Sequence, residues 1–175
     1  MEGVAEKLRR LLDCNDLYRL KGRLRADDLL VRNRAGAELQ AAGNMVRDLA
    51  GRYHLGFVPP STRENPFPAP EVTRTLAELD HLERDVSDVE TSIRGQAVPG
   101  RDRVWDAVRD ELGTLDLLLQ FDLLLITQAQ EVREEVGKLD AAALSPGWDR
   151  GVREKLNRLK ATLKDRSAQL EYQVF

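Results

Sequence analysis

Residues 112–126 read LGTLDLLLQFDLLLI, the most apolar run in a chain of 175 residues. On both sides of this run apolar residues continue at intervals of three and four, which is the spacing of one face of an α-helix. Within the run, leucines lie on all sides of the helix axis. A helix that is apolar all round has neighbours on most sides. We therefore expect residues 102 to about 138 to form the central helix of an all-α bundle.

Two aspartates, Asp116 and Asp122, interrupt this apolar run. Each costs roughly 3 kcal/mol near the middle of a membrane helix, whereas each apolar residue contributes only about −0.5 kcal/mol. These terms cancel, so we expect no membrane span. The N-terminus is charged from Glu2 onward and lacks the apolar core of a signal peptide, which favours a cytoplasmic location.

The same two aspartates are the carboxylates that we expect to be buried. A buried unpaired aspartate would cost several kcal/mol, so each needs a partner such as an arginine or a tyrosine. Asp116 and Asp122 are six residues apart and differ by about 120° in direction around a helix, so they do not converge as an acid–base pair. We interpret them as residues that fix the register of neighbouring helices.

Apolar periodicity predicts three further helical segments, at 4–55, 70–94 and from 146 onward, the first of them possibly broken near residues 13–16. A proline-rich linker at 57–70 separates the first segment from the second. The predicted fold is a single domain over residues 1–175, an up-and-down antiparallel bundle of four long helices with coiled-coil-like seams. Unbroken, the first segment would be about 75 Å long and the central helix about 55 Å. The first segment must therefore bend or project, and a projecting part would expose its apolar stripe unless another chain covered it.

Small residues recur every seven positions in the first segment, at Gly36, Gly43 and Ala50. Glycine inside a helix costs about 1 kcal/mol relative to alanine, so this stripe needs a reason. Close packing within the chain is the more common use of such a stripe; a dimer interface and a hinge are the alternatives. The candidate interface comprises Gly36, Gly43, Ala50, Leu20, Leu24 and Val31.

Basic residues are concentrated in segments 17–34 and 150–166, while the overall net charge is −3. Pairing with acidic segments of neighbouring helices is one interpretation, and a nucleic-acid-binding surface is the other. The negative net charge favours the first interpretation. The candidate basic patch comprises Arg19, Lys21, Arg23, Arg25, Arg32, Arg34, Arg150, Arg153, Arg158 and Lys160.

Catalytic and metal-binding patterns find little support. The chain has two histidines, His54 and His81, and one cysteine, Cys14, which we expect to be buried and unreactive. Glu78 and His81 form a single Glu-x-x-His pair, whereas a di-iron bundle needs two such pairs and two more carboxylates. We therefore predict no catalytic residues, no cofactor and no metal, and we expect a non-enzymatic protein.

The function that these patterns favour is that of an interaction protein, a scaffold, adaptor or regulatory subunit acting through protein–protein contacts and self-association. A nucleic-acid-associated protein using segments 17–34 and 150–166 is the alternative. An enzyme that uses His81 is a more distant third hypothesis.

Overall fold

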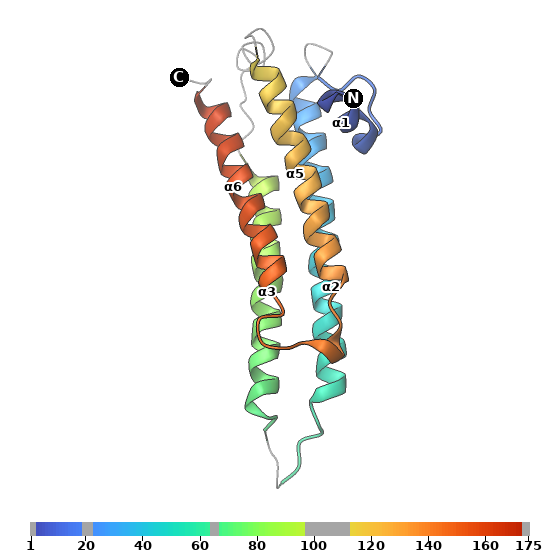
Figure 1. Cartoon of the computed structure of the whole chain (residues 1–175), viewed down its shortest axis with the longest axis vertical. Helices are drawn as coiled ribbons and strands as arrows, with labels where there is room; N and C mark the ends of the chain where they lie inside the picture. Colours follow the sequence, from blue (N-terminus) through green and yellow to red (C-terminus); the bar gives the residue numbers. More distant parts are fainter. Residues whose placement is uncertain (1–2, 19–22, 64–66, 97–112, 173–175) are drawn as a thin grey trace.

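A computed structural model describes residues 3–18, 23–63, 67–96 and 113–172. For residues 170–172 it describes the backbone and not the side chains. Within these ranges the chain is helical and contains no strand, which confirms the all-α prediction. The elements are α1 (Val4–Leu12), α2 (Leu24–Phe57), α3 (Pro70–Gly95), α5 (Thr114–Gly137), the 3₁₀ turn η1 (Ala141–Ala143) and α6 (Arg150–Tyr172). Four of these helices are long, as expected, and α1 is a short fifth helix at one end of the bundle (Figure 1).

The predicted break in the first segment is confirmed. Helix α1 ends at Leu12 because Asp13 adopts a left-handed conformation (φ 50°) that no helix can continue. The next helix, α2, begins only at Leu24 and continues without interruption to Phe57.

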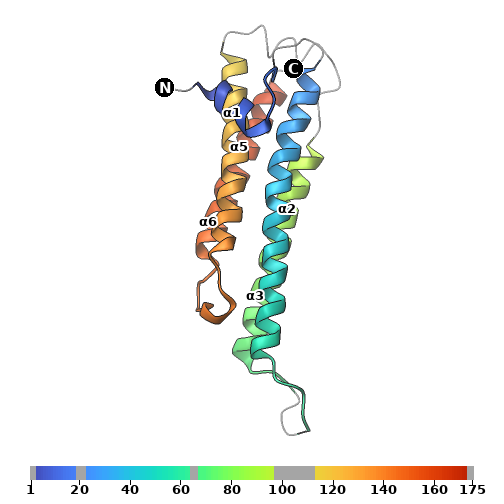
Figure 2. The same ribbon diagram turned by 90° about the vertical axis from the view of Figure 1, so that its right-hand side faces the viewer.

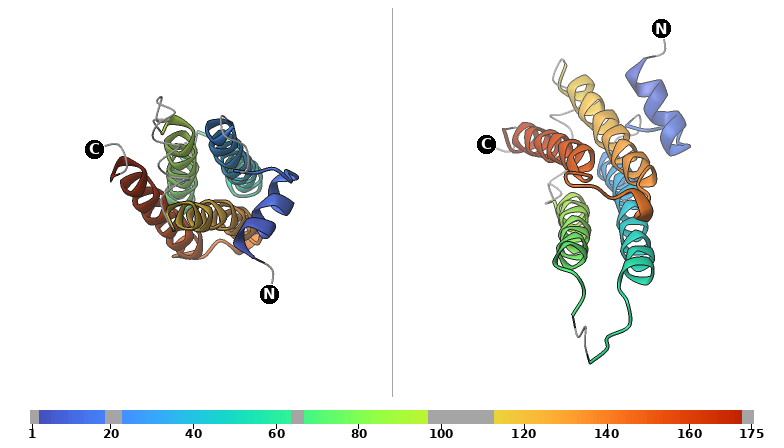
Figure 3. Two further views of the ribbon diagram at one scale, coloured as in Figure 1. Left: turned by 90° about the horizontal axis from the view of Figure 1, so that it is seen from above. Right: turned by 60° about the horizontal axis from the view of Figure 1, so that its bottom comes forward.

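The bundle consists of two antiparallel hairpins, α2–α3 and α5–α6, which lie side by side (Figures 1 and 3). Contacts between the hairpins join α2 to α5 and, less extensively, α3 to α6. Between α2 and α5, Arg166 of α6 bridges Asp28 and Asp122, Glu38 pairs with Arg133, and Met45 contacts Gly137. In these three contacts the residue number on α2 and the residue number on α5 rise together, so the two helices run parallel.

This parallel seam corrects the prediction that all neighbouring helices would be antiparallel. That prediction assumed that short links join neighbours. Residues 97–112, which lie outside the described ranges, separate α3 from α5. A link of that length can reach a helix that is not adjacent to α3, so α5 is free to pack beside α2.

The start of the central helix was also predicted wrongly. Gly113 has φ +87° and caps α5, so the helix that contains the leucine run begins at Thr114 rather than at 102. The expected cap at Asp102 and the turn before it lie outside the described residues. The last helix begins at Arg150 rather than at Pro146, because Gly147 (φ +83°) lies in a turn that precedes it.

Two glycines of the small-residue stripe face α3 of the same chain. A Cβ atom on Gly36 would approach the Arg94 side chain to 2.7 Å, and one on Gly43 would lie 3.8 Å from Val86 Cγ1. Ala50 packs half-buried against the core, and Leu24 and Val31 are buried within the bundle. The stripe therefore serves the close approach of α2 to α3, while Leu20 lies outside the described residues.

The space at Gly43 leads to a prediction. Alanine has the higher helix propensity, and its methyl group would meet Val86 at an ordinary van der Waals distance. We expect Gly43→Ala to raise the free energy of unfolding by about 0.5–1 kcal/mol, measured by urea denaturation. A loss of stability would show that the α2–α3 seam is tighter than the structure indicates.

The α2–α3 hairpin extends beyond the α5–α6 hairpin (Figures 1 and 2). Met45 packs against Gly137, where α5 ends, and Trp148, just before α6, donates a hydrogen bond to Glu78. Residues 46–58 and 67–77 therefore lie past the ends of α5 and α6, and we call them the projecting hairpin. At 1.5 Å per residue the α2 part of this projection is about 18 Å long.

Candidate functional site

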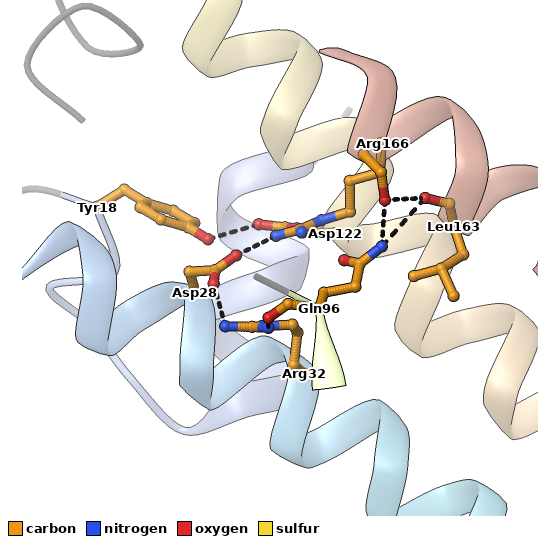
Figure 4. Close-up of polar contacts among 8 residues, drawn as sticks. Tyr18, Asp28, Arg32, Gln96, Asp122, Leu163 and Arg166 are labelled. Carbon is orange, nitrogen blue, oxygen red and sulfur yellow. Dashed lines mark hydrogen bonds and ion pairs between the residues drawn. The ribbon is translucent and has the colours of Figure 1, made fainter. Parts of the chain in front are cut away.

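The core contains a cluster of charged side chains, which Figure 4 shows, at the end of the bundle opposite the projecting hairpin. Asp122 of α5 is fully buried and accepts hydrogen bonds from Arg166 Nε at 2.8 Å and from the Tyr18 hydroxyl at 2.7 Å. Arg166, only 1% exposed, also binds Asp28 of α2. The predicted partners of Asp122, an arginine and a tyrosine, are confirmed.

The cluster extends from Asp28 to the end of α3. Arg32 Nη2 lies 2.8 Å from Asp28 Oδ2 as an ion pair, and Arg32 Nη1 donates to the carbonyl oxygen of Gln96 at 2.7 Å. The Gln96 amide in turn donates to Ser167 of α6. Side chains from the α1–α2 connection and from α2, α5 and α6 therefore meet, together with Gln96 directly after α3, through one set of polar contacts.

Tyr18 takes part through an unusual backbone conformation. Its φ of 57° is in the left-handed region, which is uncommon for a tyrosine. The conformation lets the Tyr18 amide donate to Asp27 at 2.8 Å while its hydroxyl reaches Asp122. Sequence periodicity offers no signal for such a residue, because it lies between helices.

Burial raises the pKa of Asp122, although Arg166 and Tyr18 act in the opposite direction. A carboxyl whose pKa is higher in the folded state favours folding in its protonated form. Its contribution to stability is thus fully present below its ordinary pKa of 3.8 and is lost as the pH rises through the raised pKa.

This shift predicts how the stability of the wild type differs from that of Asp122→Asn, a variant that cannot titrate at this position. The free energy of unfolding of the wild type minus that of the variant should decrease as the pH rises from 4 to 7. Urea denaturation at several pH values measures it. A difference that grows with pH would mean that the ion pair with Arg166 outweighs the cost of burial.

The prediction for Asp116 is wrong: this residue is exposed in the first turn of α5. There a carboxylate interacts favourably with the helix dipole and needs no buried partner. Cys14 is half-buried rather than fully buried. His81 is exposed on α3, and His54 is exposed near the end of α2.

The candidate basic residues do not form one surface. Arg32 is buried in the charge cluster. Arg34 pairs with Glu38 on the same helix, and Arg153 pairs with Asp149 and with Asp85 of α3. Arg158 pairs with Glu154 in the same way. Arg23, Arg25, Arg150 and Lys160 are exposed, on parts of α2 and α6 that lie far apart along the bundle, and Arg19 and Lys21 lie outside the described residues.

The projecting hairpin carries the two most exposed large apolar side chains among the described residues and a third that is partly exposed. Leu55 is 86% exposed, Phe67 83% and Phe57 43%; we call these three residues the tip. The Phe57 ring stacks on Tyr53, with centroids 4.6 Å apart, so the chain holds it in place.

Beside the tip, the end of α5 leaves a notch against α2. The notch has a volume of about 530 Å³. Both apolar and charged residues line it. The lining includes Met45, Leu49, Gly51, Leu55, Val136 and Leu139, together with the charged residues Arg47, Asp48 and Arg52 of α2.

Comparisons with protein-family models, with curated proteins and with solved structures found no match to this chain. Among the described helices, none has the length and apolar character required to cross a membrane.

Proposed function

We propose that this protein is a non-enzymatic interaction protein that binds other polypeptide chains through its projecting hairpin. The observation that supports the proposal is the tip, where Leu55, Phe57 and Phe67 are displayed to solvent. Burying a leucine or phenylalanine side chain contributes about 1.5–3 kcal/mol of favourable free energy. A partner that covers these three side chains would gain that free energy, which the isolated chain does not.

The rest of the molecule supports this use. The charge cluster joins α2, α5 and α6, and Gln96 directly after α3, at the opposite end of the bundle, and the projecting hairpin extends from that base as two paired helices. A rigid, preformed surface loses little conformational entropy when it binds. The geometry therefore suits a scaffold or adaptor that presents one end to its partner.

Affinity capture with matched variants tests the proposal. The wild-type chain, the tip variant Leu55→Asp/Phe67→Asp and the control Leu124→Asp are each immobilised and exposed to an extract of the source cells. Leu124 is a suitable control because it is 44% exposed on α5, away from the tip. We expect a protein that the wild type and the control retain and the tip variant loses.

Circular dichroism checks that all three chains remain helical. If the three chains retain the same set of proteins, the tip is not the contact surface and the proposal is wrong.

A further inference from the structure

Residues 3–18 pack on the bundle at the end that holds the charge cluster, and we call them the strap. Helix α1, which forms most of the strap, lies across α5 and α2 (Figure 2). Leu8 and Leu17 anchor the strap with buried side chains, and the Tyr18 hydroxyl lies directly against Asp122 (Figure 4). The strap therefore covers one side of the charge cluster.

The four long helices pack on one another without help from the strap. Helix α2 contacts both α3 and α5 directly, and α5 contacts α6. If Tyr18 moved away, Asp122 would keep its ion pair with Arg166, and Asp28 would keep its ion pairs with Arg166 and Arg32. Detachment of the strap is thus a local opening that leaves the bundle and its buried ion pairs in place.

Two features of the closed strap cost free energy. Tyr18 has φ 57°, a left-handed conformation that is strained for a tyrosine. Arg9 Nε is buried and has no hydrogen-bond partner among the described residues. Both costs are relieved when the strap moves into water. Helix α1 is also only 9 residues long, too short to be stable by itself, so its contacts with the bundle hold it in place.

We propose that the strap is a latch that opens and closes over the charge cluster while the four long helices stay packed, and that Tyr18 holds it closed. Tyr18 suits this role because its two hydrogen bonds join the strap to α2, through Asp27, and to α5, through Asp122. In the closed form Asp122 and Arg166 are excluded from water, and in the open form they become accessible.

The latch does not depend on the proposed function. The strap and the tip lie at opposite ends of the molecule (Figure 1). A tip that binds no partner would leave the latch intact, and a strap that never opens would leave binding through the tip intact.

Thiol labelling at two buried positions measures the opening. In a Cys14→Ser chain, Leu8→Cys places the single thiol on the buried face of the strap, and Val132→Cys places it in the core of the bundle. A thiol reagent reaches the first position when the strap detaches and the second only when the bundle unfolds. We expect the Leu8→Cys thiol to react at least about tenfold faster than the Val132→Cys thiol.

Further substitutions in these chains separate the latch from global unfolding. Tyr18→Phe removes the hydroxyl that bonds Asp122, so the Leu8→Cys thiol should react about tenfold faster or more. Tyr53→Phe makes the same chemical change in the projecting hairpin and should leave that rate unchanged. Leu125→Ala weakens the core, so it should speed the reaction of the Val132→Cys thiol and not that of the Leu8→Cys thiol.

The inference is overturned if the two thiols react at equal rates, if Leu125→Ala speeds both alike, or if Tyr18→Phe acts no differently from Tyr53→Phe. Hydrogen exchange on the unmodified chain checks that Leu8→Cys has not itself loosened the strap. The Tyr18 amide, which donates to Asp27, should exchange at least about tenfold faster than the slowest amides of α5. Equal protection of these amides would also overturn the latch.

Discussion

Replacing Arg166 by methionine is expected to lower the free energy of unfolding by about 3–5 kcal/mol, the usual cost of breaking a buried ion pair by removing one partner. Arg166 is buried against Asp28 and Asp122, so its removal leaves Asp122 without a cation in the core, whereas Asp28 keeps its ion pair with Arg32. Methionine keeps much of the side-chain volume, which separates the loss of charge from the creation of a cavity. Urea denaturation at neutral pH measures the change.

Arg158→Met provides the matched control, since it removes the same charge from the same helix. Arg158 is 55% exposed and pairs with Glu154, and exposed pairs of this kind contribute about 0–1 kcal/mol. Similar losses in the two variants would show that total charge, and not the buried cluster, determines stability.

Truncating Leu125 to alanine is expected to cost about 2–5 kcal/mol, whereas the same change at Leu124 should cost less than about 1 kcal/mol. The two leucines are adjacent on α5, but Leu125 is fully buried between the hairpins and Leu124 is 44% exposed. The pair therefore tests which side of the leucine run faces the core. Equal costs, measured by thermal or urea denaturation, would contradict the orientation of α5.

The fold class and the buried aspartate could be predicted from the sequence because each follows from a strong free-energy term. Apolar residues at helical spacing require a bundle, and a carboxylate inside the leucine run requires a cation or a hydroxyl beside it. Asp116 shows the limit of this reasoning. It lies in the same run, but the helix begins only two residues earlier, at Thr114, and its first turn is exposed.

Topology and the fate of single basic residues could not be predicted in the same way. The parallel packing of α5 beside α2 depends on where the link after α3 leads, and helical periodicity carries no information on that path. Arg32 looks like its neighbour Arg34 in the sequence, but one turns into the core and the other outward to Glu38. Which arginine is buried depends on the position of Asp28 and Gln96, which only the packed structure reveals.

The projecting hairpin was foreseen in part. The surplus length of the first helical segment predicts that it bends or projects, and the structure shows both a break between α1 and α2 and a hairpin that extends beyond α5 and α6. The notch was not foreseen, since it arises where α5 ends against Met45 and therefore depends on the register between two hairpins.

Hydrogen–deuterium exchange with and without the protein that the wild type and the control retain tests most directly whether the projecting hairpin is the contact surface. We predict that amides of residues 46–58 and 67–77 exchange more slowly in the complex, while those around Asp122 and Arg166 exchange equally in both samples. Protection confined to another face of the bundle, or no protection at all, would contradict binding through this hairpin.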